Sequence, residues 1–160
     1  MTITIKVSSR SRLQRAARRL REAGEGGLQA RITAAIVEAS PAALAAVRAA
    51  WLGVDVQSTR GGGSSSGLRG RIAGATDFVP IGRGVRFQVD GAQVDPAYGR
   101  SLAWYVNGVG RWRHPVFGNT NAWTQQSGET VFAPTLRAQE PQYRMQLERV
   151  LDEVAREIEG

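Results

Sequence analysis

The first long segment with helical periodicity runs from Leu28 to Trp51. Its apolar residues recur every three or four positions, so they share one face of a helix. They are Leu28, Ile32, Ala35, Ile36, Ala39, Leu44, Val47 and Trp51. Ser40-Pro41 interrupts this segment. Because proline is tolerated at a first helical position after a serine cap, the pair fits either a kink or the start of a new helix.

Residues 139–158 carry the clearest helical pattern in the chain. The apolar positions at i, i+4, i+7 and i+11 are Leu147, Leu151, Val154 and Ile158, with Met145 and Val150 beside them. A stripe of this kind is typical of a core or subunit contact, and it predicts a C-terminal amphipathic helix.

Near the start of the chain, residues 3–7 (ITIKV) alternate apolar and polar positions, which predicts a half-buried strand. The segment that follows predicts an arginine-rich helix ending near Ala23, before the EGG at 25–27. Its narrow apolar stripe consists of Leu13, Ala16, Ala17 and Leu20.

Shorter patterns fill the middle of the chain. Residues 67–76 (GLRGRIAGAT) fit one or two helical turns, and residues 85–89 (VRFQV) alternate again. Asp90-Gly91 followed by AQV is a hairpin signal. Asp95-Pro96 fits the cap and first residue of a short helix, although LAWYV, residues 102–106, fits a buried strand equally well.

Two short extended pieces, AWTQQ (122–126) and TVFAP (130–134), flank Ser127-Gly128. The order is therefore helices, then short strands and loops, then a helix, which predicts an α+β fold. We expect one domain over residues 1–160, with N-terminal and C-terminal helices packed on a small antiparallel or mixed sheet.

The stretch QSTRGGGSSSG, residues 57–67, has the composition of a flexible loop. Its Gly63-x-Ser65-x-Gly67 spacing matches a nucleophile elbow formally. That motif needs a buried strand before the serine, and Ser, Thr, Arg and Gly cannot supply one.

Charge is distributed unevenly along the chain, which has a net charge of +7. Seven basic residues precede the first acid, Glu22, whereas acids outnumber arginines after Ala138. The two parts can complement each other within one subunit or between neighbouring copies. The excess also favours a polyanion such as DNA, although a basic helix face is often simply solvated.

Candidate chemistry is sparse. The chain has no cysteine and one histidine, so thiol catalysis and cysteine-ligated zinc are excluded, and we expect no metal or other cofactor. The N-terminus lacks the apolar region of a secretory signal, and no uninterrupted apolar run approaches the roughly 20 residues of a membrane span. We therefore expect a cytoplasmic protein without membrane contact.

The stretch RWRHPVFGN, Arg111 to Asn119, holds that histidine, His114. Pro115 fixes one backbone angle, and Gly118-Asn119 tolerates left-handed conformations. Rigid aromatic residues beside arginines are typical of a protein interface. The same side chains would serve a nucleic-acid site through phosphate contacts and base stacking, which leaves that alternative open.

HPVFGN followed by Trp123 and Gln125, between arginine- and alanine-rich helices and a C-terminal amphipathic helix, resembles the tail-component family of tailed bacteriophages. These are small neck proteins, also called head–tail joining or tail completion proteins. The resemblance spans about Ser9 to Glu159. It implies a virion protein at the head–tail junction, made in the bacterial cytoplasm.

The resemblance further implies a non-catalytic ring, of six copies by analogy with tail symmetry, between the portal or stopper and the tail terminator or tail tube. The expected subunit or partner interface is Trp112, His114, Pro115, Phe117, Gly118, Asn119 and Trp123. A DNA-lumen or neighbouring-subunit face is expected at Arg10, Arg12, Arg15, Arg18 and Arg19. The rival hypothesis is a stand-alone basic nucleic-acid-binding domain.

Overall fold

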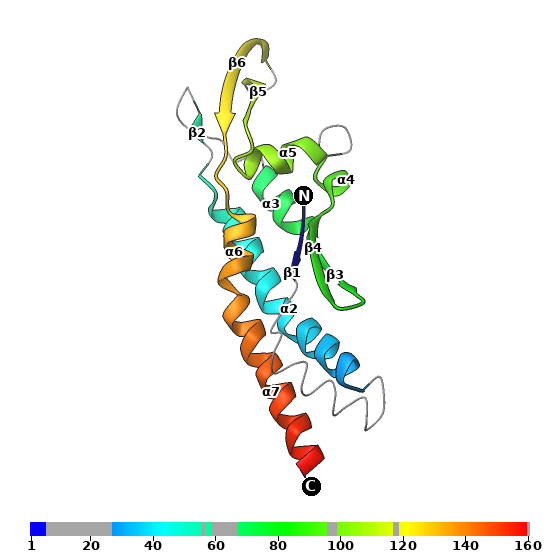
Figure 1. Ribbon diagram of the computed structural model, residues 1–160. Coiled ribbons are helices and arrows are strands. Elements are labelled where there is room, and N and C mark those ends of the chain that lie inside the picture. Colours follow the sequence, from blue (N-terminus) through cyan, green and yellow to red (C-terminus); the bar gives the residue numbers. More distant parts are fainter. Residues whose placement is uncertain (6–26, 56, 59–66, 96–98, 117–118, 160) are drawn as a thin grey trace.

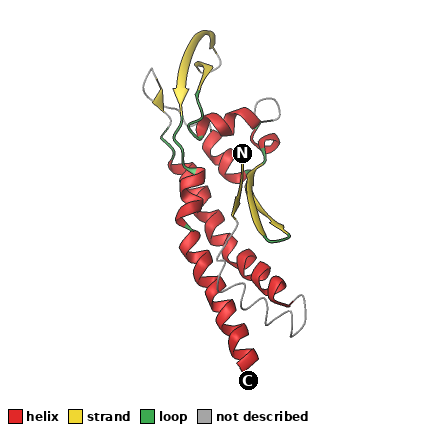
Figure 2. Cartoon of the chain, in the orientation of Figure 1, coloured by secondary structure: helices red, strands yellow, loops and turns green. Residues whose placement is uncertain are grey.

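The computed structural model describes residues 1–5, 27–55, 57–58, 67–95, 99–116 and 119–159. Within these ranges the helices are α2 (Gly27–Gly53), α3 (Leu68–Gly74), α4 (Gly91–Val94), α5 (Gly99–Val106), α6 (Phe132–Ala138) and α7 (Glu140–Glu159). The strands are β1 (Thr2–Ile5), β2 (Gln57–Ser58), β3 (Thr76–Ile81), β4 (Gly84–Val89), β5 (Arg111–Val116) and β6 (Asn119–Ser127). Helices and antiparallel strands are segregated, which confirms the predicted α+β class (Figure 2).

Helix α2 is the central element of the fold. Its alanine-rich sequence favours helix, and its buried positions follow the predicted apolar face. The helix continues through Pro41, so the alternative of a new helix starting there is wrong. Pro41 lacks the N–H that would donate to the Val37 carbonyl, and its ring lies on the exposed side of the helix. The hydroxyl of Ser40 donates to the Ile36 carbonyl one turn earlier, at 2.7 Å.

Helices α6 and α7 run back along α2 in the opposite direction (Figure 1). The ring of Phe132, at the start of α6, packs against Trp51 with centroids 5.8 Å apart. Farther along, Tyr143 and Ser40 share a buried hydrogen bond of 3.0 Å. Since the one Ser40 hydroxyl proton already goes to Ile36, the Tyr143 hydroxyl is the donor in this bond.

Burial raises the pKa of the Tyr143 hydroxyl above its ordinary value of 10.0, because the phenolate would lose its hydration. Neutral Tyr143 therefore ties α7 to α2 inside the core.

The first sheet has the strand order β1-β4-β3 and is antiparallel throughout. Its β3–β4 hairpin pairs Phe78 with Phe87, whose rings lie 5.8 Å apart on the face directed at the core. Arg48 of α2 donates through both Nε and Nη2 to the Thr76 carbonyl, at 3.2 and 2.9 Å. The sheet is thus fixed to α2 by both packing and hydrogen bonds.

Two of the local predictions made from the sequence are wrong. The expected hairpin around Asp90-Gly91 does not form, because β4 pairs with the preceding strand β3 and residues 91–94 are helical. The Asp90 side chain caps that short helix by accepting from the Ala92 amide at 3.0 Å. Residues 132–134, expected to be extended, form the first turn of α6.

Of the described helices, α2 alone is long and apolar enough, by length and composition, to cross a membrane. Arg31, Glu38 and Arg48 interrupt its apolar sequence. A central core helix meets the same criterion, and α2 buries nine of its residues within the fold.

Candidate interaction site

The described residues of the stretch RWRHPVFGN lie in a hairpin, β5–β6, that extends beyond one end of the helical body (Figure 1). The second sheet has the order β2-β6-β5, and the two described residues of β2 pair with Ser127 and Gln126 at the base of the hairpin. The hairpin is therefore a projecting element, and its attachment to the body decides where it points.

That attachment is built around Asn107, a buried polar residue between α5 and β5. Its side-chain oxygen accepts from the amides of Val131 and Phe132, at 3.1 and 3.0 Å, which lie at the start of α6. Its carbonyl accepts from the Thr130 hydroxyl at 3.1 Å. One side chain thus joins the chain entering the hairpin to the chain leaving it.

Two glycines permit this close crossing. Gly108 has φ +78°, and a Cβ there would lie 2.8 Å from the Thr130 hydroxyl oxygen. A Cβ on Gly128 would overlap the Val106 carbonyl. The amide of Glu129 donates to that same carbonyl at 3.1 Å. At the base of the hairpin the backbones of the two segments therefore touch directly, and any residue other than glycine at position 108 or 128 would separate them.

The strand register assigns the hairpin's side chains to two faces. Residues directly opposite each other in an antiparallel pair share a face. Trp112 lies opposite Gln126 and is buried, with its ring stacked on Tyr105 of α5 at 6.1 Å. Thr124 is also buried. This inner face turns toward α5 and is occupied by the chain itself.

The outer face carries most of the exposed side chains described on the hairpin. Arg111, Arg113 and Pro115 of β5 lie opposite Ser127, Gln125 and Trp123 of β6, respectively. We call these six residues the outer face of the hairpin. Both arginines, Gln125 and Trp123 are exposed, and the indole of Trp123 is 44% exposed.

Two contacts hold Trp123 in place although it is exposed. Its indole N–H donates to the Thr120 carbonyl at 2.7 Å. The guanidinium carbon of Arg113 lies 5.7 Å from the indole ring centroid, within range of a cation–π interaction. An exposed aromatic ring fixed in one orientation loses little conformational entropy on binding, which favours an interaction surface.

The charge of this region is one-sided. No acidic residue occurs between Asp95 and Glu129, whereas Arg100, Arg111 and Arg113 lie in that span. The outer face therefore offers guanidinium, amide and hydroxyl donors without a carboxylate. Such a face favours partners that carry negative charge.

The predicted interface residues divide between the two faces and the tip. Trp112 is a buried support, while Pro115 and Trp123 belong to the outer face. His114 lies on β5 opposite Thr124 in the register, and Asn119 begins β6, where its side chain accepts from the Asn121 amide at 3.0 Å. Phe117 and Gly118 lie outside the described residues.

The arginine-rich face predicted at Arg10, Arg12, Arg15, Arg18 and Arg19 also lies outside the residues that the structure describes. Sequence reasoning missed Asn107 and Tyr105 as parts of the candidate site. The Asn107-Gly108 dipeptide is a turn signal that marks the base of the hairpin. Nothing local in the sequence marks the stacking of Tyr105 on Trp112.

Scans of this chain against protein-family models, curated proteins and solved structures find no match.

Proposed function

We propose that this chain is a structural neck protein of a tailed bacteriophage. As part of an oligomeric ring, it joins the DNA-filled head to the tail. The observation that carries the proposal is the position of the described residues of HPVFGN…W…Q. They lie on a projecting hairpin whose outer face exposes Arg111, Arg113, Trp123 and Gln125. A connector needs such an element, because it must contact a neighbour without unpacking its own core.

The proposed partners are further copies of the chain, six by analogy with tail symmetry, together with the portal or stopper and the tail terminator or tail tube. The role needs no catalysis or cofactor. Its place is the head–tail junction of the virion, after assembly in the bacterial cytoplasm. Passing DNA would make at most non-specific phosphate contacts with such a ring.

Replacing Trp123 tests the proposal. Trp123→Ala removes an exposed, fixed ring, so the free energy of unfolding should change little. Loss of a central interface aromatic costs about 2 kcal/mol or more, roughly thirtyfold in affinity. In a phage that depends on the supplied variant, separate heads and tails should accumulate in electron micrographs, and the infectious titre should fall.

Trp104→Ala is the matched control, because Trp104 on α5 is also 44% exposed but lies off the hairpin. It should support normal joining. Normal particles from Trp123→Ala, or equal defects in both variants, would contradict the proposed role of the hairpin.

The net charge of +7 favours the second candidate, a stand-alone nucleic-acid-binding domain. That candidate predicts tight DNA binding whose affinity falls steeply with salt and with neutralisation of Arg12, Arg15, Arg18 and Arg19. A salt titration of DNA binding by filter retention distinguishes it from the neck protein.

A further inference from the structure

A second exposed surface lies on α7, away from the hairpin. Pro141, Met145, Glu148 and Asp152 follow one another at i, i+4, i+7 and i+11, so they share one face of the helix. All four are exposed, and Met145 is 62% exposed. We call these four residues the α7 stripe; its first half is apolar and its second half is acidic.

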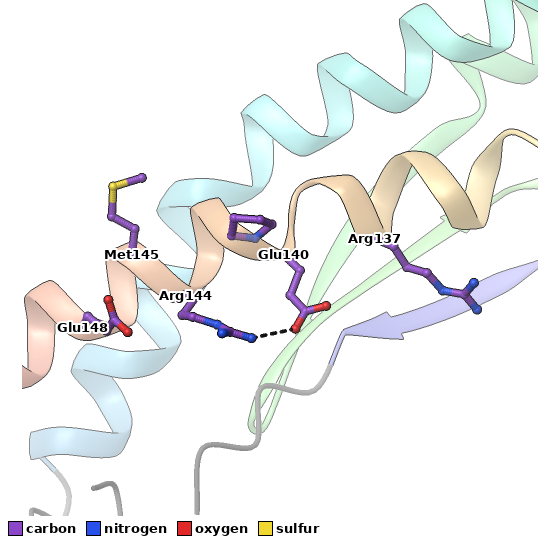
Figure 3. Close-up of a pocket in the computed structure, with 6 residues that line it drawn as sticks. Arg137, Glu140, Arg144, Met145 and Glu148 are labelled. Carbon is purple, nitrogen blue, oxygen red and sulfur yellow. Dashed lines mark hydrogen bonds and ion pairs between the residues drawn. The ribbon is translucent and has the colours of Figure 1, made fainter.

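The apolar half of the stripe borders a hollow of about 350 Å³ on α6 and α7 (Figure 3). Its lining residues are Arg137, Glu140, Pro141, Arg144, Met145 and Glu148. Within it Arg144 forms an ion pair with Glu140 at 3.2 Å. Glu148 and Asp152 have no side-chain ion pair within the described part of the chain.

The outer face of the hairpin has the matching order of chemistry. Pro115 and Trp123 lie toward the tip, and Arg113 and Arg111 follow toward the base. Like Glu148 and Asp152, Arg111 has no ion pair among the described residues. Each surface therefore presents an apolar half followed by a charged half, and the charges are opposite.

The spacings of the two surfaces also agree. Arg111 and Arg113, two residues apart on a strand, are separated by about 7 Å along it. Glu148 and Asp152, four residues apart on a helix, are separated by about 6 Å along its axis. With the two arginines facing these carboxylates, the ring of Trp123 falls near Met145, where a sulfur–aromatic contact is favourable.

These surfaces cannot meet within one molecule. The hairpin projects beyond one end of the body, while α7 runs to the opposite end (Figure 1). A contact between them therefore joins two copies through different surfaces. Such heterologous contacts form rings when the rotation closes.

The outer face suits a protein better than nucleic acid. The guanidinium of Arg113 lies over the Trp123 ring, where a base would otherwise stack. Two exposed arginines also supply few of the phosphate contacts on which tight DNA binding depends.

We infer that the outer face of the hairpin in one copy binds the α7 stripe of a second copy. This is the copy-to-copy contact of the ring, and in that respect it rests on the proposed function. Arg111 and Arg113 pair with Glu148 and Asp152, while Trp123 packs beside Met145 and the hollow.

Charge reversal of the full-length chain tests the contact by light scattering and analytical ultracentrifugation. Arg111→Glu with Arg113→Glu should weaken self-association roughly tenfold or more at low salt, and Glu148→Arg with Asp152→Arg should do the same. An equimolar mixture of the two double variants should recover association, because one copy's reversed hairpin then faces the other's reversed stripe.

Arg83→Glu with Arg86→Glu is the matched control, since it changes net charge equally on the exposed side of the β3–β4 hairpin. It should associate like the unaltered chain, and circular dichroism should show every variant folded. An unaltered chain that stays monomeric, reversals without effect, or a mixture that fails to recover association overturns the inference. None of these results decides head–tail joining, which the Trp123 experiment measures separately.

Discussion

At the scale of single residues, Asn107 determines how the projecting hairpin is attached. It is buried, yet its side chain satisfies two amides at the start of α6 and donates to the sulfur of Met1 at 3.1 Å. Without an acceptor there, the buried amide of Phe132 and the partly buried amide of Val131 would lack a partner. Unpaired buried donors are costly, so this one side chain has a large effect on stability.

We expect Asn107→Ala to lower the free energy of unfolding by about 2–3 kcal/mol, because it removes both hydrogen bonds and leaves two amides unpaired. Urea unfolding measures the change. Asn107→Asp keeps an acceptor at the helix N-terminus, where negative charge is favourable, and should retain most of the stability. Equal losses in the two variants would show that the acceptor is not what matters.

At the scale of elements, the pairing of α2 with α7 depends on a polar contact inside an apolar interface. Tyr143 and Ser40 lie 103 residues apart in sequence, and their hydrogen bond joins the middle of α2 to the first turns of α7. Burial favours the neutral hydroxyl, which makes the pairing of these helices sensitive to alkaline pH.

The sign of that dependence follows from the raised pKa of Tyr143 in the folded chain. Above about pH 10 the unfolded chain releases this proton while the folded chain retains it, so the free energy of unfolding falls as pH rises. Urea unfolding between neutral and alkaline pH should show the fall. Below pH 10 this group contributes its full stabilisation.

Tyr143→Phe should cost about 1 kcal/mol at neutral pH through the lost hydrogen bond, and it should remove this part of the alkaline fall. Tyr105→Phe is the control. It leaves Tyr143 in place, so the free energy of unfolding should still fall at alkaline pH. An alkaline fall of the same size in Tyr143→Phe would contradict the assignment.

At the scale of the whole molecule, the β5–β6 hairpin projects from a packed body and makes few contacts with it. Among the described elements, the hairpin strands make their substantial contacts with each other and with β2. The β3–β4 hairpin instead packs on α2. Stability is therefore expected to fall from the body toward the tip of β5–β6.

Native-state hydrogen exchange should show this gradient. Amides of residues 119–125 in β6 should exchange faster than those of β4, because local opening of the projecting hairpin does not require the core to unpack. Association through the outer face should slow exchange in the hairpin and leave β4 unchanged. Equal protection of the two hairpins in the monomer would contradict the gradient.

The sequence alone predicts those elements whose period is long or whose local chemistry is strong. The apolar faces of α2 and α7 are visible as repeats, although Met145, which periodicity placed beside the apolar face of α7, is in fact exposed. Asp90-Gly91 shows the limit of local signals. It fits a hairpin turn and a helix cap equally well, and the pairing of β4 with β3 selects the cap.

For the candidate site too, local sequence features predict some properties and long-range contacts decide the others. The α+β class, the aromatic and arginine content of residues 111–123 and the lack of acidic residues there could all be predicted from the sequence, because composition and periodicity are local properties. The burial of Trp112 and the exposure of Trp123 could not be predicted in this way, because they depend on the strand register, which places the two rings on opposite faces of the hairpin. The tertiary structure also decided where the hairpin points, because Asn107 bonds to residues more than twenty positions away.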